Sequence, residues 1–221
     1  MKVTTVRGIG LGIIGFGLLA SSLAKADPAP DPESAEVAPV PSVAATAAPA
    51  GPGQLRLGFM LVPAPFGSLT SGPPGEEFSV ASVFAFGVMP VLDLSLAHHL
   101  FVGFAPSYTF NIKAQGGAPD PASELDLLLR IGAEAAATDR LHLYGYVSPG
   151  YAFMFGLPSD TTGRGPVVGL HGGARFDLAA AFFVNAEVGF QAGFQTASVD
   201  GSSREYYASF MQIGLGAGVR I

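Results

Sequence analysis

The last sixteen residues of the chain, from Tyr206 to Ile221, alternate between apolar and small or polar side chains. From Met211 onward every second residue is apolar, and the residues between them are Gln212, three glycines and Arg220. A period of two predicts a β-strand with one apolar face and one small or polar face. Together with an export signal and no helical membrane span, such a strand favours a closed barrel in a lipid bilayer.

Eight segments between Gln54 and Ile221 are predicted to be strands. Their lengths suit a tilted strand that crosses a bilayer, which needs about 9–11 residues, whereas the average globular strand has only about 5–6. The segments are Gln54–Ala64, Phe78–Leu92, His99–Ile112, Ser123–Ala136, Leu141–Phe155, Pro166–Phe176, Phe182–Thr196 and Glu205–Ile221.

Two of these segments separate apolar from polar residues most clearly. In Phe182–Thr196, Val184, Val188 and Phe190 share one face, and Glu187 lies on the other. In Ser123–Ala136 every odd residue from 125 to 133 is apolar, and most of the even ones are charged. A secreted β-sandwich with its polar face in water would give the same pattern, and it is the rival fold. Segment length, the export signal and the uncharged apolar faces favour lipid.

The connections alternate between long and short along the chain. The segments 63–77, 113–122, 156–165 and 197–204 are rich in Gly, Pro, Ser, Thr and Asp, whereas 92–98, 137–140 and 177–181 are mostly shorter. Long loops on one side and short turns on the other are typical of outer-membrane barrels. We therefore predict an all-β fold, an eight-stranded antiparallel up-and-down transmembrane β-barrel over residues 54–221. Aromatic residues near the strand ends are predicted to form interfacial girdles: Phe59, Phe78, Tyr108, Phe110, Tyr151, Phe182, Phe194 and Tyr207.

Two segments precede the predicted barrel. Residues 1–26 have a charged start, an apolar run from Gly8 to Ala20 and a small-x-small site at Ala24–Ala26, the pattern of a cleaved signal peptide; a retained anchor is the alternative. Residues 27–53 are rich in Pro and Ala and contain no basic residue, so we expect a disordered periplasmic tail. Its simplest role is that of a spacer, and a partner-binding tail is the alternative.

Composition narrows the function classes further. The chain has no Cys, which excludes disulfides and thiolate metal sites. Its mean hydropathy of +0.43 is high, yet no 18-residue run after residue 26 is free of interruption by Gly, Pro or charge. Cleavage after residue 26 would leave 8 basic against 17 acidic residues, a net charge of −9. Such a charge argues against nucleic acid and against anionic membrane surfaces as partners.

With this pattern in view, the chain resembles the small outer-membrane barrels of the OmpA transmembrane-domain and OmpX type. The stretches Asp93–Gly103 and Leu143–Tyr151 are similar to turn-plus-strand segments of that class. The resemblance covers about residues 54–221 and lies in pattern, without a diagnostic motif. One departure is the last residue, because such barrels usually end in an aromatic residue that the insertion machinery recognises, and this chain ends in Ile221.

An eight-stranded barrel has an interior just wide enough for side chains to fill. Both signs of charge occur on the predicted inward faces, so ion pairing is possible. We expect these side chains to form a structural network in the lumen; a narrow conduction path is the alternative. The predicted lumen residues are Arg56, Glu124, Asp126, Arg130, Glu134, His171, Arg175, Glu187, Gln191, Gln195, Gln212 and Arg220.

No set of residues points to an enzyme, so we expect no catalytic residues, no cofactor and no metal site. His98 and His99 are adjacent and would point to opposite faces of a strand. His142 follows a short turn, and His171 has no carboxylate at ligand spacing. The His-x-Ser pair of lipid A deacylase barrels is absent, and the external connections contain no His, which the palmitoyltransferase barrels use at that end. Omptin proteases need ten strands and a His and an Asp at the outer rim, whereas this sequence predicts eight strands and offers no such set.

The sequence thus predicts a non-enzymatic outer-membrane protein with a structural or surface-interaction role. A narrow passive pore is the second interpretation, and a lipid-modifying enzyme the third. Expected partners are outer-membrane lipid, lipopolysaccharide and the outer-membrane insertion machinery. Among the external connections only Arg164 and Phe66 stand out as contact residues, and solvated positions are the simpler interpretation for both.

Overall fold

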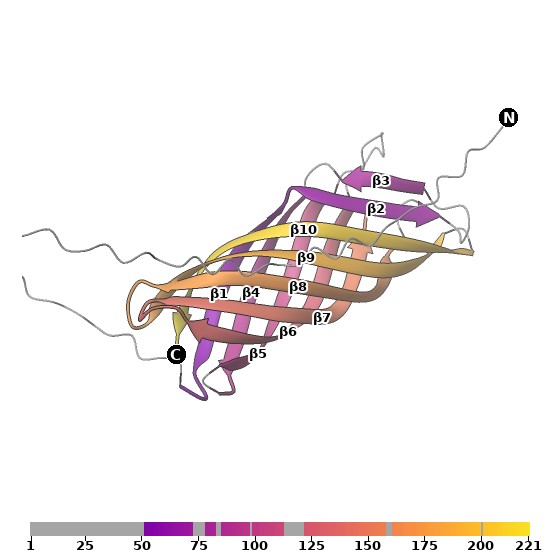
Figure 1. Cartoon of the computed structure of the whole chain (residues 1–221). Helices are drawn as coiled ribbons and strands as arrows, with labels where there is room; N and C mark the ends of the chain where they lie inside the picture. The colour runs from indigo at the N-terminus through magenta and orange to yellow at the C-terminus, as the bar shows by residue number, and fades with distance from the viewer. Residues whose placement is uncertain are drawn as a thin grey trace, which may run out of the picture. The chain divides into compact units, whose positions relative to one another are not determined.

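The computed structural model describes residues 51–72, 78–82, 85–97, 99–112, 122–157, 161–199 and 201–221. These residues form ten β-strands (Figure 1). The strands are β1 (Leu55–Ala64), β2 (Phe66–Gly72), β3 (Phe78–Ser82), β4 (Ala85–Ser95), β5 (Leu100–Ile112), β6 (Ala122–Ala136), β7 (Leu141–Phe155), β8 (Gly163–Asp177), β9 (Phe182–Val199) and β10 (Ser202–Arg220). Among these residues, no helix has the length and apolar character needed to span a bilayer.

Eight of the strands close into a ring of antiparallel neighbours. From β4 to β10 each strand pairs with the next one along the chain, β1 pairs with β4, and β1 also pairs with β10. The last pairing removes the free edges that an open sheet would present. The predicted fold class, an eight-stranded antiparallel up-and-down barrel, is therefore confirmed.

One element departs from the prediction: β2 lies within a segment that we expected to be a connection. β1 and β2 are two parts of one long strand, and β4 and β3 are two parts of its partner, because a single register runs from Leu55↔Leu94 to Ser71↔Phe78. β2 pairs with β10 on its other side, and β3 is the outer strand of this ribbon (Figure 1). The sequence of β2, Phe-Gly-Ser-Leu-Thr-Ser-Gly, has no apolar alternation, so pairing with β10 and β3 stabilises it.

A β-bulge separates β1 from β2. Opposite β10, Leu61 pairs with Leu215 and Phe66 pairs with Met211, so β1 and β2 use one residue more than β10 over this stretch. Such an extra residue switches the face on which the following side chains lie. Ala64 is accordingly buried, whereas Phe66 has 69% of its surface exposed.

Several other connections are shorter than predicted because the strands extend into them. β8 begins at Gly163, and β9 and β10 meet at Val199↔Ser202. Gly201 lies in this tight turn with φ 78°, a conformation that residues with a side chain rarely adopt. Arg164, which we expected in a loop, is therefore part of β8.

Three short turns and the end of the chain define one end of the barrel, which we call the terminal rim. The turns after β4, β6 and β8 have the same backbone hydrogen bonds, such as Leu178 N–H to Phe182 O and Ala137 N–H to Leu141 O. Ile221 exchanges two backbone hydrogen bonds with Leu55. Gly53 donates a backbone hydrogen bond to Ser95, so the last residue of the predicted tail is attached to the barrel. The opposite end, at the ends of β5, β7 and β9, is the distal rim.

Candidate functional site

The side chains that point into the barrel fill it from one rim to the other. All the predicted lumen residues lie inside the barrel, with relative exposures of 7% or less except for Arg220, whose side chain alone is 5% exposed at the terminal rim. The strands place them there because their polar residues recur at every second position. The lumen divides into a charged part near the terminal rim, a part with amides and carboxylates in the middle and an apolar part near the distal rim.

The charged part begins with Asp177 at the terminal rim. Its Oδ2 lies 3.0 Å from His142 Nε2, and its Oδ1 accepts a hydrogen bond from Arg220 Nη2. Arg175 Nε lies 3.7 Å from the same Oδ1. Three strands, β7, β8 and β10, are thus joined at one carboxylate beside the chain end.

Glu134 on β6 is the next carboxylate of the network. Its Oε2 accepts hydrogen bonds from Arg56 Nη1 at 2.6 Å and from Arg175 Nη1 at 2.8 Å. These side chains are 6%, 3% and 5% exposed, so the triad is almost completely removed from solvent. A buried triad of this kind is tolerated only when each charge has partners, and Glu134 supplies a shared partner to two cations.

Arg130 is the centre of the deepest charged cluster. It donates to both carboxylate oxygens of Asp93, at 3.1 and 2.9 Å, and lies 3.7 Å from Glu187 Oε2. Its guanidinium carbon is 4.1 Å from the centre of the Tyr146 ring, a cation–π geometry. The hydroxyls of Tyr144 and Tyr146 donate to Glu187 at 3.0 and 2.7 Å.

His171 stacks on Tyr146, with ring centres 4.7 Å apart and an interplanar angle of 6°. Its Nδ1 lies 3.8 Å from Glu187 Oε1. A hairpin of β8 and β9 through the short turn at 177–181 predicts that His171 and Glu187 lie directly opposite or one diagonal step apart on the same inward face. This prediction is confirmed, because His171 pairs with Gly189 and Glu187 pairs with Gly173. The two side chains are diagonal neighbours inside the barrel, a two-residue slip that leaves their shared face unchanged.

Glycines on β8 and β9 leave room for the His171 ring. A Cβ at Gly189 would collide with Nδ1 of the ring, and a Cβ at Gly169 would lie 2.5 Å from its Nε2 and closer still to Ser148 Oγ. Neither nitrogen of the His171 ring has a hydrogen-bond partner in the described part of the chain, and Ser148 Oγ has none there either. Buried polar atoms of this kind usually bind ordered water.

Between His171 and the distal rim the lumen contains hydrogen-bonded pairs of an amide and a carboxylate. Gln191 donates to Asp126 at 2.7 Å and accepts from Gln212 at 3.4 Å, while Gln195 donates to Glu124 at 3.0 Å. Beyond them an apolar cluster fills the distal part. Its buried members are Ala64, Ala85, Ile112, Ala122, Met154, Leu157, Ala197, Tyr206, Ala208 and Phe210.

A cavity of about 20 Å³ lies within the charged part, lined by Arg56, Arg130, Glu134 and their neighbours. A single water needs about 10–15 Å³ by this measure. The cavity therefore accommodates a water molecule and is too small for an organic solute.

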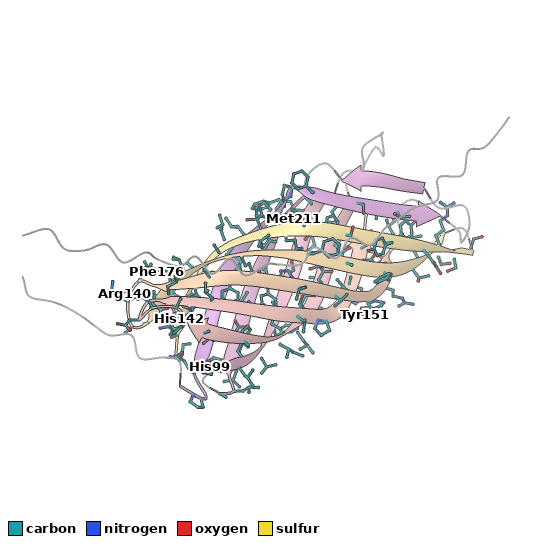
Figure 2. The ribbon with its side chains drawn as sticks, in the orientation of Figure 1. His99, Arg140, His142, Tyr151, Phe176 and Met211 are labelled. Carbon is teal, nitrogen blue, oxygen red and sulfur yellow. The ribbon has the colours of Figure 1, made fainter. Side chains whose placement is uncertain are left out.

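Three further residues lie in the lumen: Asp93 and Asp177, from segments that we predicted to be turns, and His142, from the start of a predicted strand. Asp93, His142 and Asp177 are 9%, 4% and 2% exposed and belong to the ion network. Figure 2 shows His142 beside Arg140 at the terminal rim. Extending the alternation by one or two residues past the predicted strand ends would have placed Asp93 and Asp177 on the inward faces. Tyr144 and Tyr146 lie two and four residues after His142 and therefore share its inward face on β7. They were missed because tyrosine suits either face of a strand.

The two remaining histidines, His98 and His99, are adjacent in the chain. His99 is at the terminal rim, where its Nδ1 lies 3.2 Å from the Glu134 carbonyl oxygen (Figure 2). His98 lies outside the described residues. Within the described ranges, no three His, Cys, Asp or Glu side chains are grouped as metal ligands.

The outer wall is apolar over most of its height. Outward residues such as Leu129, Leu170, Val188, Phe190 and Leu215 are exposed although they are large and apolar. On β8 the outward residues are uncharged from Phe176 to Pro166. The ten steps between them, at about 3.3 Å each and tilted by about 40°, span about 25 Å, the height of the apolar band of outer-membrane barrels. Of the predicted girdle residues, Phe59, Tyr108, Phe110, Tyr151, Phe182 and Phe194 point outward; the Phe78 side chain lies outside the described residues.

A closed eight-stranded ring, a packed polar interior and an apolar outer wall define a small transmembrane β-barrel of the outer-membrane type. The structure is similar to that of the outer membrane protein OprG from Pseudomonas aeruginosa, with a TM-score of 0.59 and 12% identity over 77% of this chain and 97% of that chain. It also matches Neisserial surface protein A (TM-score 0.46, 9% identity, 74% of this chain and 97% of that chain). A third match is Ail, the attachment invasion locus protein of Yersinia pestis (0.43, 12%, 77% and 99%).

The resemblance to small eight-stranded outer-membrane barrels is thus confirmed at the level of the fold. At these identities the matches show the fold and no activity. No family model and no curated protein matches the sequence.

Proposed function

We propose that the chain is a non-enzymatic outer-membrane barrel whose interior is sealed, with a structural or surface-contact role in the cell envelope. The observation that supports this proposal is the filling of the lumen in two successive layers. The ion network around Glu134 and Arg130 blocks the terminal half, and the apolar cluster around Met154 and Phe210 blocks the distal half.

A sealed lumen predicts the absence of conductance. The protein, refolded and inserted into a planar bilayer, should show no stable single-channel openings. Replacing Arg56, Glu134 and Arg175 together by Ala removes part of the ion network, and replacing Met154 and Phe210 by Ala opens part of the apolar cluster. Because the Arg130 cluster and the amide–carboxylate pairs lie in series with both, each of these variants, and their combination, should stay closed. Discrete openings of the unmodified protein would contradict the proposal.

A narrow passive pore is the second candidate function. Charged residues from Asp177 at the terminal rim to Arg130 in mid-barrel would supply a polar path for ions. The apolar cluster interrupts this path, which is why the sealed barrel is the better-supported proposal. The conductance measurement separates the two.

The third candidate, a lipid-modifying enzyme, has weak support from the geometry. Within the described residues, Ser148, His171 and Glu187 come nearest to a nucleophile–base–acid arrangement, and all three are at most 6% exposed in the lumen. A lipid substrate has no route to them through the filled barrel. A change in the mass of lipid A after deletion of the gene would favour the enzyme.

We further propose that the chain is exported and that its signal peptide is cleaved before the insertion machinery places the barrel in the outer membrane. The small-x-small site at Ala24–Ala26 supports cleavage before Asp27. Mass spectrometry of the protein from outer-membrane fractions tests this: the expected N-terminus is Asp27. A protein that fractionates with soluble secreted material would contradict the location.

A further inference from the structure

The outer wall carries a hollow near the distal rim that the sealed-barrel function does not use. It has a volume of about 870 Å³ and lies over β7, β8, β9 and the first residues of β10. Tyr151 and Phe153 on β7 form one side, with ring centres 5.3 Å apart, and Phe194 on β9 lies on the other. Pro166 on β8 lies between them.

Cross-strand pairing places the polar lining of the hollow in one row. Phe153 pairs with Arg164, and Arg164 pairs with Thr196. The row below it, nearer the terminal rim, contains Tyr151 paired with Pro166. The row nearer the terminal rim is therefore apolar, and the row beyond it contains Arg164 and Thr196 beside the Phe153 ring.

Arg164 is unusual on this wall. Among the outward-facing strand residues that the structure describes, only Arg164 and Glu205 are charged. The ion pairs found among the described residues lie inside the barrel, and Arg164 takes part in none of them. Glu205 is also paired with Thr196, so it is two strands away from Arg164, about 10 Å at the usual strand spacing.

The height of Arg164 matches a lipid headgroup. On β8 the uncharged outward stretch of about 25 Å ends at Pro166, which pairs with Tyr151, and Arg164 is the next outward residue toward the distal rim (Figure 2 shows Tyr151 toward that end). A guanidinium at this level faces phosphate groups of the outer leaflet, for which its planar fork is suited. Aromatic side chains just below it pack against acyl chains.

We propose that this hollow binds one phosphorylated glycolipid of the outer leaflet, lipopolysaccharide, with Arg164 on a lipid A phosphate, Thr196 beside it and acyl chains against Tyr151 and Phe194. The inference rests on the proposed function and on the distal rim lying outside, the side opposite the three short turns, because short turns are typical of the periplasmic side. The whole chain has a net charge of −6, so general electrostatic attraction to an anionic lipid is not expected. Binding has to come from this local arrangement.

Native mass spectrometry of the refolded full chain in detergent tests the proposal, with diphosphoryl lipid A as the probe and fully dephosphorylated lipid A for comparison. The unmodified protein should retain diphosphoryl lipid A, and Arg164→Gln should weaken its binding about tenfold, the effect of losing one charge-assisted contact. Arg164→Lys should recover part of the affinity. Arg140→Gln is the matched control, because it removes the same charge from an exposed turn at the terminal rim (Figure 2). Glu205→Gln should leave binding unchanged or strengthen it.

Equal binding by the unmodified protein and Arg164→Gln would overturn the proposal, as would equal loss in Arg140→Gln. Equal retention of the two lipid A forms would show that apolar contacts alone bind the lipid, which also overturns the phosphate site. Heat-modifiable gel mobility, measured on every variant, reports folding separately. A protein that neither folds nor inserts into vesicles would contradict the proposed function itself, whereas a folded and inserted protein without lipid A preference would contradict only the lipid site.

Discussion

Replacing Glu134 by Gln should strongly destabilise the barrel. Glu134 Oε2 binds both Arg56 Nη1 and Arg175 Nη1, at 2.6 and 2.8 Å, so the two nitrogens lie at most 5.4 Å apart. Two unit charges at about 5 Å repel each other by about 3 kcal/mol at an effective dielectric constant of about 20. Removing one partner of a buried ion pair typically costs about 3–5 kcal/mol. We expect the free energy of unfolding to fall by about that amount.

Urea unfolding in lipid vesicles measures this difference. The chain contains no Trp, so Phe190→Trp, on the outer wall, provides a single fluorescence reporter in every variant. Glu205→Gln, which removes an exposed carboxylate, is the control and should change stability by less than about 0.5 kcal/mol. Combining Glu134→Leu with Met at both Arg56 and Arg175 should recover most of the loss, because an apolar triad has no unpaired charge. A loss below about 1 kcal/mol in Glu134→Gln would refute the role of Glu134 as a shared partner.

Three further predictions concern the wall, the packing inside it and the N-terminal segment. Val188→Lys should impair insertion by about 2–4 kcal/mol, since it places a cation in the apolar band. Ser198→Lys, on the same strand and face near the distal rim, should cost much less. Equal yields of inserted protein for the two variants would count against an outer wall that faces lipid. Gly189→Ala should destabilise the barrel by about 1–3 kcal/mol in urea unfolding, because the added Cβ collides with the His171 ring. Adding His171→Ala to the same chain should reverse part of that loss. If it does not, the collision is not the cause of the destabilisation. Deleting residues 27–50 should leave the heat-modifiable gel mobility unchanged, and loss of the folded band would show that the segment packs on the barrel.

The faces of the strands were predictable because alternation decides them. Each polar residue assigned to the lumen from Arg56 to Arg220 is inside, since a shift of one residue would have placed a whole row of charges in lipid. The exact pairing between strands was less accessible. The turn Leu178–Ala181 contains Leu and three Ala, without Gly, Pro or Asn to fix a turn type. Registers two residues apart therefore fit the sequence equally well, and the sequence places His171 and Glu187 either directly opposite or diagonal to each other; the structure has the diagonal arrangement.

Residues at strand ends were missed for a related reason. The polar residues Asp93 and Asp177 resemble turn residues, and nothing local distinguishes an Asp that begins a turn from one that ends a strand and binds an arginine of a distant strand. β2 was missed because its stability comes from two partner strands and not from its own pattern. In each of these cases the deciding contact joins segments far apart in the sequence.

The bulge between β1 and β2 affects how the ring is completed. β10 pairs with β1 from Arg56↔Arg220 to Leu61↔Leu215, and past the bulge it pairs with β2 from Phe66↔Met211 to Gly72↔Glu205, while β9 accompanies β10 without interruption from Ser202↔Val199 to Val219↔Phe182. The wall that the bulge interrupts is therefore also the one whose strands are most distant along the chain, and contacts of high sequence separation are the slowest to form. Until that wall has formed, β1 and β10 are both free edges, available to a second molecule as readily as to each other. Substitutions along this interrupted seam would then appear first as slower assembly and greater aggregation, even in variants whose completed barrel is as stable as the original.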